Sequence, residues 1–171
     1  DSEINHGSDF GFEISLEIID EFGGNINIPT DFTKLRILFI GRNKKNAENF
    51  GQTVKKWSIH HVDYVIDDKQ ACDKLGEANA SGLIYDVIFI DLDMNKSAQE
   101  RSASIKNICT MIEQTVTSVV IICPMGAGDL YQGLQQIISK PIRQLELYNT
   151  LYSLIRSSLP VLEYKSDNKL H

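Results

Sequence analysis

The residue best placed for chemistry in this sequence is Asp91, a carboxylate that directly follows the apolar run of residues 87–90. An apolar run of this length, without alternation, is typical of a central strand that is covered on both faces. In open parallel sheets, sites for ligands and chemistry lie just beyond the carboxyl ends of such strands. Asp91 is therefore the first candidate for a nucleophile or for one half of an ion pair.

Four further residues stand near the ends of other apolar runs, and the function of Asp91 depends on them. They are Gly41, Arg42, Cys123 and Lys140. The set contains two cations and one thiol but no second carboxylate. A reaction at Asp91 would therefore have to use positive charge supplied by side chains.

The elements that position these residues follow from the pattern between residues 35 and 158. Apolar runs predict strands at 36–40, 61–66, 87–90, 118–122 and 136–139. Helical spacing predicts helices at 43–57, 67–78, 97–113, 129–135 and 143–157, of which the fourth has at most two turns. This alternation predicts a doubly wound α/β fold: a five-stranded parallel sheet in the order 2-1-3-4-5, with helices on both faces. Right-handed crossovers then bring the candidate residues to one edge of the sheet.

The two ends of the chain lie outside this alternation. Residues 10–22 have helical spacing, and Gly23-Gly24 predicts the end of that helix. Residues 25–34 predict a connector that leaves room for a strand of a few residues. The chain therefore divides into an N-terminal helical extension at 1–34, one α/β domain at 35–158 and a C-terminal tail at 159–171.

Composition narrows the class of protein. The formal net charge of −6 and the sequence pI near 5.2 argue against non-specific binding of nucleic acid, which requires a basic face. Three cysteines without metal-ligand spacing indicate reduced thiols in a cytoplasmic protein. No apolar run is long enough for a membrane span and no signal-peptide pattern opens the chain, so we expect no direct membrane contact. The first residue is an Asp, which indicates a fragment of a larger protein whose membrane anchor, if it has one, lies elsewhere.

Two motifs carry a resemblance to a known family. Residues 86–94 (DVIFIDLDM) and 139–142 (SKPI) are similar to the phospho-acceptor strand and the lysine-proline pair of receiver domains, which occur in two-component response regulators and hybrid histidine kinases. Residues 35–157 as a whole resemble such a domain, although Asn95 replaces the proline that usually follows the first motif. The resemblance implies that a phosphoryl group passes from a histidine to Asp91, with a magnesium ion and Lys140 neutralising its charge.

The chain departs from that family within the implied site. Gly41 and Arg42 stand where the family has an acidic pair that holds magnesium, so we expect magnesium binding to be lost or very weak and assign no metal ligand or cofactor. Cys123 replaces the threonine or serine that contacts the phosphoryl group, and Ile137 replaces the aromatic switch residue. These departures predict a degenerate receiver, or pseudo-receiver, with no catalytic residue of its own.

A weaker resemblance concerns the N-terminal extension. Residues 10–15 followed by 21–24 are similar to the glycine box and the following helix that end the ATP-binding domain of histidine kinases. Asp9 and Glu13 stand where that family prefers small residues, so we expect no ATP binding. A kinase tail directly before a receiver implies an internal receiver of a hybrid sensor histidine kinase. Its expected partners are the kinase core, a neighbouring receiver or phosphotransfer domain and, as an open alternative, a second copy of itself.

Asp91 and Arg42 each allow two interpretations. Asp91 is either a structural group paired with Lys140 and Arg42, which would favour its ionised form, or a live phosphorylation site. The missing acidic pair favours the structural interpretation. For Arg42, an ion pair with Asp91 or a solvent-facing position competes with a guanidinium that binds phosphate in place of magnesium.

Three hypotheses for the function follow. The first is a non-catalytic contact module within a hybrid histidine kinase, and the second is a working phospho-receiver with Asp91 as acceptor. The third is a distinct α/β domain that shares only the fold. The third is disfavoured because the stretch Gly41-Arg42-Asn43 is far from a glycine-rich phosphate loop and the sequence shows no Ser-His-Asp set.

Overall fold

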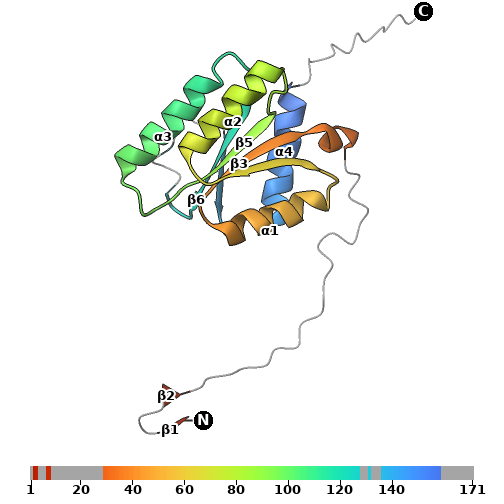
Figure 1. Cartoon of the computed structure of the whole chain (residues 1–171). Coiled ribbons are helices and arrows are strands. Elements are labelled where there is room, and N and C mark those ends of the chain that lie inside the picture. Colours follow the sequence, from red (N-terminus) through yellow and green to blue (C-terminus); the bar gives the residue numbers. More distant parts are fainter. Residues whose placement is uncertain (1, 4–6, 9–28, 128–130, 132–135, 159–171) are drawn as a thin grey trace, which may run out of the picture.

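A computed structural model describes residues 2–3, 7–8, 29–127, 131 and 136–158 of the 171-residue chain. Its centre is a sheet of five strands: β3 (Arg36–Ile40), β4 (His61–Val65), β5 (Val87–Asp91), β6 (Ser118–Pro124) and β7 (Gln136–Lys140). Neighbouring strands all pair in parallel, in the order β4-β3-β5-β6-β7. The predicted doubly wound sheet in the order 2-1-3-4-5 is therefore confirmed (Figure 1).

The burial of the strands follows their composition. All five residues of β5 are buried, and so are four of the five in β3, because both strands are apolar and covered on both faces. The edge strand β4 is more polar and leaves His61 and Tyr64 exposed. The order of the strands thus places the carboxyl end of β5, and with it Asp91, at the middle of one sheet edge.

Four α-helices are described: α1 (Lys44–Lys55), α2 (Asp68–Ser81), α3 (Ala98–Met111) and α4 (Gln144–Ser158). The first three begin after Asn43, Asp67 and Ser97, whose side chains each accept a hydrogen bond from a backbone N–H of the first turn. Ser97 and Glu100 complete a reciprocal capping box. Helix α2 continues beyond the expected residue 78 and ends at Gly82, whose φ of 70° lies in the left-handed region.

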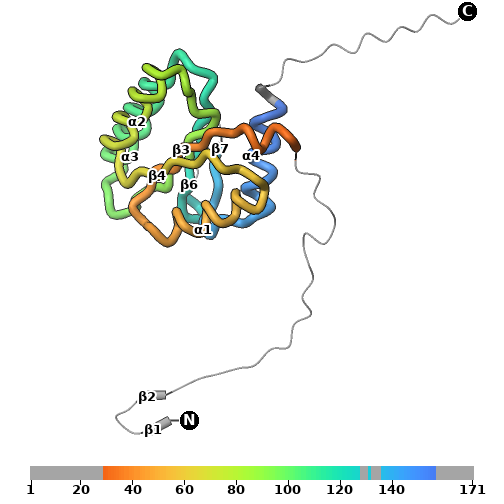
Figure 2. The backbone as a smooth tube through the Cα atoms, turned by 45° about the vertical axis from the view of Figure 1, so that its right-hand side comes forward, coloured from red at the N-terminus to blue at the C-terminus, as the bar shows by residue number. Residues whose placement is uncertain are grey.

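The helices cover the sheet in two layers, with α1 and α4 on one side and α2 and α3 on the other (Figures 1 and 2). The side of α1 and α4 is rich in aromatic rings: Phe50 lies 4.7 Å from Phe39 and 4.8 Å from Phe89 between ring centroids. The side of α2 and α3 is aliphatic, and its buried residues include Leu38, Leu75, Ile88, Ile105 and Ile121. Both cores are therefore built on alternate residues of the same strands.

Residues Thr30–Lys34 form a short 3-10 helix, η1, where the sequence left a connector or a short strand open. Phe32 is fully buried, and its ring centroid lies 6.4 Å from that of Trp57 and 5.5 Å from that of Tyr148. The Phe32 N–H donates to the Pro29 carbonyl at 2.9 Å, which closes the turn. The structure of this stretch is therefore set by the packing of the Phe32 ring between Trp57 and Tyr148, and not by pairing with a strand.

Several predictions fall on residues outside the described ranges. They are the helix at 10–22, the short fourth helix at 129–135 except for Tyr131, and the tail at 159–171. Within the N-terminal extension the structure describes two short strands, β1 (Ser2–Glu3) and β2 (Gly7–Ser8), which pair in antiparallel fashion. None of the described helices is long and apolar enough to cross a membrane.

Candidate functional site

Asp91 is the last residue of β5 and lies at the carboxyl edge of the sheet, with 8% of its surface exposed. Its Oδ1 forms an ion pair with the ammonium group of Lys140, which ends β7 two strands away. The Lys140 Nζ also donates a hydrogen bond to the Leu92 carbonyl at 3.3 Å. The pairing supplies a countercharge to a carboxylate that would be costly to bury alone. The expected ion pair between Asp91 and Lys140 is therefore present.

The register of the sheet explains how Lys140 reaches Asp91. Side chains alternate across a strand, and Phe89 and Ile138, two residues before Asp91 and Lys140, both belong to the core beneath α1 and α4. Asp91 and Lys140 therefore project to that same side of the sheet. The lysine stem bridges β6, whose residue opposite Asp91 is Ile122.

The second oxygen of Asp91 has a partner that sequence reasoning missed. The side-chain amide of Asn46 donates to Asp91 Oδ2 at 2.9 Å. Asn46 stands in the first turn of α1, where its backbone N–H donates to the capping side chain of Asn43 at 3.1 Å. The cap fixes the first turn of α1 beside the end of β5. The predicted start of a helix at residue 43 was thus the only signal that pointed to Asn46.

Gly41 follows β3 and lies directly beside Asp91. A Cβ built on Gly41 would lie 2.9 Å from Asp91 Cβ, which is closer than real Cβ contacts come. The Gly41 N–H donates to the Val65 carbonyl at 2.9 Å and so anchors the loop to β4. Position 41 therefore has no room for a side chain beside Asp91 in this arrangement.

Arg42 lies at the site but does not contact Asp91. Its Nη1 is 3.9 Å from Asp93 Oδ2, and 64% of its side chain is exposed. The ion pair expected between Arg42 and Asp91 is therefore wrong, whereas the solvent-facing position is confirmed. Asp93 is held by the turn that follows β5, because the Asn95 N–H donates to its Oδ1 at 3.0 Å. This hydrogen bond, together with the positive charge of Arg42, lowers the pKa of Asp93.

Cys123 and Ile137 do not line the pocket around Asp91. Cys123 is fully buried in the core beneath α2 and α3, and Ile137 packs against that same core. Both lie on the opposite face of the sheet from Asp91, in agreement with the alternation along β6 and β7. Burial raises the pKa of the Cys123 thiol, which argues against its use as a reactive thiolate. Cys123, which the sequence predicted beside Asp91, is therefore a small core residue on the other face of the sheet.

A second wall of the site joins the beginnings of α2 and α3. Lys96 Nζ lies 3.6 Å from Asp68 Oδ1, and the Ser104 hydroxyl donates to Asp68 Oδ2 at 3.2 Å. Arg101 is 8% exposed; it donates to the Tyr131 hydroxyl at 2.8 Å and to the Lys96 carbonyl. Lys96 and Arg101, the two cations of this wall, are therefore paired with Asp68 and Tyr131. A separate hollow of about 380 Å³ is lined by Asn46, Asp91, Asp93 and Lys140, among other residues.

Comparison with known proteins confirms the resemblance to receiver domains at the level of fold. No protein-family model matches the chain. Over 139 residues the chain is 27% identical to the osmosensing histidine protein kinase SLN1 of Saccharomyces cerevisiae, a match that covers 73% of this chain and 11% of that kinase. The chain thus corresponds to a small part of its curated relative.

Two solved structures show the same fold. The receiver domain of the histidine kinase CKI1 from Arabidopsis thaliana, complexed with Mg²⁺ and BeF₃⁻, has a TM-score of 0.57 at 18% identity, covering 75% of this chain and 97% of that one. A co-crystal structure of the Saccharomyces cerevisiae phosphotransfer protein Ypd1 with the receiver domain of Ssk1 matches with a TM-score of 0.57 at 15% identity, covering 75% and 94% of the two chains. The five-stranded sheet of this chain is thus that of a receiver domain.

Proposed function

We propose that this chain is a degenerate receiver, a pseudo-receiver of two-component phosphorelay signalling, which acts through protein contacts and is not phosphorylated on Asp91. The observation that carries the proposal is that both carboxylate oxygens of Asp91 are engaged within the chain, by Lys140 and by Asn46. An attacking oxygen must direct a lone pair at phosphorus. Here an incoming phosphoryl group would compete with Lys140 and Asn46 for the lone pairs of the two oxygens.

The residues around Asp91 do not fit the magnesium ion that receiver chemistry uses. Mg²⁺ requires near-octahedral oxygen ligands at short distance. Glycine supplies no ligand at position 41, and the guanidinium of Arg42 is a fixed positive charge beside Asp93. Within the described ranges, no three side chains of the types His, Cys, Asp and Glu are grouped to hold a metal. The domain would therefore carry no cofactor.

The proposed context is a hybrid sensor histidine kinase in the cytoplasm, with the kinase core or a neighbouring phosphotransfer or receiver domain as partner. Support comes from the match to a part of SLN1 and from the receiver fold. In this context the domain is not itself an enzyme. Its surfaces would bind the kinase core and the neighbouring domains of the parent chain and so fix their relative positions.

A second candidate function is a working phospho-receiver, and the ion pair between Asp91 and Lys140 favours it. In that reaction the P–N bond of a phosphohistidine breaks as an Asp91 oxygen forms the new P–O bond. Lys140 would balance the added negative charge. This candidate requires that a lone pair of Asp91 reach phosphorus beside the contacts with Asn46 and Lys140.

Amide NMR spectra of the domain with magnesium and beryllofluoride distinguish the two candidates. We expect the amide signals around Asp91 to stay unchanged, since the mimic of a phosphoryl group needs the metal. Large shifts of these signals, absent in an Asp91→Asn variant, would establish the phospho-receiver. Transfer of label from a phosphorylated histidine kinase to the wild type but not to Asp91→Asn would do the same.

The Arg42→Asp variant tests the reason given for the loss of the metal. It replaces a solvent-facing cation by a carboxylate beside Asp93 and leaves the packing of Gly41 intact. We expect calorimetric titration with magnesium to give no binding for the wild type and measurable weak binding for the variant. Magnesium binding by the wild type would contradict the proposal.

A further inference from the structure

The charge of this chain is divided unevenly along the sequence. Residues 1–28 contain seven acidic side chains and neither lysine nor arginine, whereas the remaining residues contain 16 acidic and 17 basic side chains. The net charge of −6 therefore resides entirely in the segment that precedes η1. The acidic residues of this segment are Asp1, Glu3, Asp9, Glu13, Glu17, Asp20 and Glu21.

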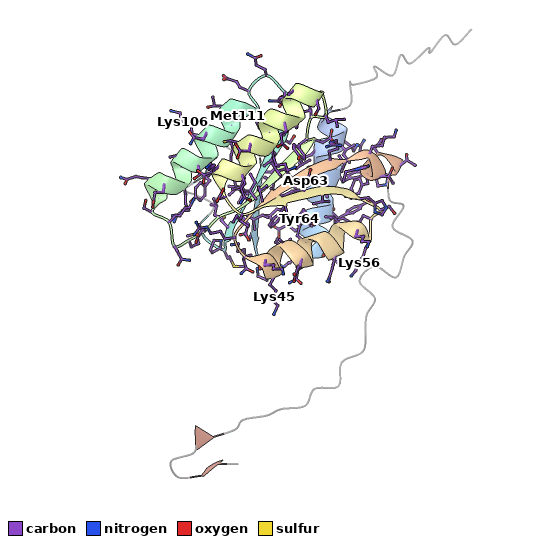
Figure 3. All side chains as sticks on the ribbon, in the orientation of Figure 1. Lys45, Lys56, Asp63, Tyr64, Lys106 and Met111 are labelled. Atoms are coloured by element: carbon purple, nitrogen blue, oxygen red, sulfur yellow. The ribbon has the colours of Figure 1, made fainter. Side chains whose placement is uncertain are left out.

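The described part of the chain has a basic face on α1. Lys45, Lys55 and Lys56 are exposed, and none of them forms an ion pair with any residue that the structure describes. Lys45 and Lys56 are three helical turns apart and so lie on one side of the helix. In Figure 3 both side chains point away from the sheet, whereas Lys106 lies across the molecule on α3.

The acidic segment joins the domain beside this face. It leads into η1, whose Phe32 contacts Trp57, the residue that follows Lys55 and Lys56. Pro29 is eight positions after Glu21, and an extended chain over eight positions reaches about 26–29 Å. The twelve residues of α1 span roughly 18 Å. The acidic side chains can therefore reach any of the three lysines.

The same end of the domain exposes apolar surface for the rest of the segment. Tyr152 is 38% exposed and stacks on Tyr148 with 6.1 Å between ring centroids. Tyr148 in turn contacts Phe32 of η1. Phe32 of η1 therefore lies between an aromatic pair on α4 and the end of α1, where Lys55 and Lys56 stand.

We propose that the basic face of α1, formed by Lys45, Lys55 and Lys56, is the docking site of the acidic N-terminal segment of the same chain. Single exposed ion pairs are weak, but several act together here. The short connection keeps the segment at a high effective concentration near α1. Docking covers the helix whose first turn supplies Asn46 to Asp91. This inference rests on charge and connection and is independent of the function proposed for Asp91.

Lysine acetylation in the full chain tests the docking. A brief pulse of an acetylating reagent, followed by mass spectrometry, gives the rate of modification for each lysine. The comparison is between the wild type and a variant with Glu17→Gln, Asp20→Asn and Glu21→Gln. We expect Lys55 and Lys56, and to a smaller extent Lys45, to react about threefold faster or more in the variant. Lys69 and Lys106, exposed on α2 and α3, should react at equal rates in both proteins.

A matched control removes acidic residues elsewhere. The Asp73→Asn, Glu113→Gln variant neutralises two exposed carboxylates of the domain and should leave the rates of the α1 lysines unchanged. Salt at about 0.5 M should abolish the difference between the wild type and the N-terminal variant, since it screens exposed pairs. Equal rates for these lysines in the two proteins at low salt would overturn the proposal. Protection that disappears on dilution would also overturn it, because the occupant would then be a second copy.

Discussion

At the scale of single residues, the close contact between Gly41 and Asp91 defines the geometry of the pocket. Besides its contact with Asp91, a Cβ on residue 41 would lie 3.0 Å from Phe39 Cε1. Asp91 is held from two other sides by Lys140 and Asn46, so it cannot move away without loss of those contacts. Packing therefore requires a glycine at position 41, since any larger residue, acidic or not, would collide with Asp91 and Phe39.

We expect Gly41→Ala to destabilise the domain by about 1–3 kcal/mol, because the added methyl group would collide with Asp91 Cβ and with the buried ring of Phe39. The matched control is Gly76→Ala in α2, where a Cβ meets nothing within 4 Å. That change should stabilise the domain by roughly 0.5–1 kcal/mol, since alanine is the better helix former. Urea unfolding measures both variants. Equal effects of the two substitutions would refute the packing argument.

Sequence reasoning found part of this site and missed part for a physical reason. Asp91 and Lys140 were placed together because strand ends in a parallel sheet meet at one edge. The contact from Asn46 spans 45 positions in the sequence and depends on the angle at which α1 leaves β3, which no local pattern encodes. The predicted ion pair of Arg42 with Asp91 was wrong, because the turn at Asn95 brings Asp93 next to the guanidinium.

At the scale of elements, the contact between the first turn of α2 and the N-terminal half of α3 rests on one carboxylate. Asp68 accepts from Ser104 and pairs with Lys96, and it thereby ties α2 to the loop before α3. Burial alone would raise the pKa of Asp68. Hydrogen bonds from its own backbone N–H and from Ser104, and the charge of Lys96, outweigh burial and lower the pKa.

The pH dependence of stability follows from that direction. A carboxyl whose pKa is lower in the folded state contributes stability above its unfolded pKa of about 3.9, and this contribution is lost as the pH falls through the folded value. We expect Asp68→Asn to cost less than about 1 kcal/mol near pH 7, because the pair is partly exposed and screened by solvent. Below about pH 4 the gap between wild type and variant should close.

Thermal or urea unfolding between pH 7 and pH 3 provides the measurement. Asp73→Asn is the control, because Asp73 lies exposed on the same helix and forms no hydrogen bond or ion pair within the described ranges. A difference between wild type and Asp68→Asn that stays constant down to pH 3 would show that Asp68 acts through packing and not through its charge.

The elements themselves were largely predictable, since the alternation of apolar runs with helical spacing fixes the type and order of each. The caps at Asn43, Asp67 and Ser97 set the starts of three helices. The 3-10 helix η1 was not predictable, because it depends on the burial of Phe32 between α1 and α4. Tertiary packing there decides the structure of a stretch whose local pattern is neutral.

At the scale of the whole molecule, two hydrophobic cores share one sheet. Phe39 and Phe89 face the core beneath α1 and α4, whereas Leu38 and Ile88 on the same strands face the core beneath α2 and α3. Because both cores are built on the same strands, disruption of the sheet in one core would expose the apolar residues of the other. The arrangement of layers in Figure 2 therefore implies a single cooperative unit.

We expect the two cores to unfold together, and the chain offers a probe for each. Trp57 is the only tryptophan, and its fluorescence reports on the core beneath α1 and α4. Cys123 is fully buried on the other side, so its reaction with a thiol reagent reports on the core beneath α2 and α3. In a variant with Cys72→Ser and Cys109→Ala, both signals should change at the same urea concentration. Two separate midpoints would show that one layer of helices detaches while the other stays folded, and the sheet would then not couple the two cores.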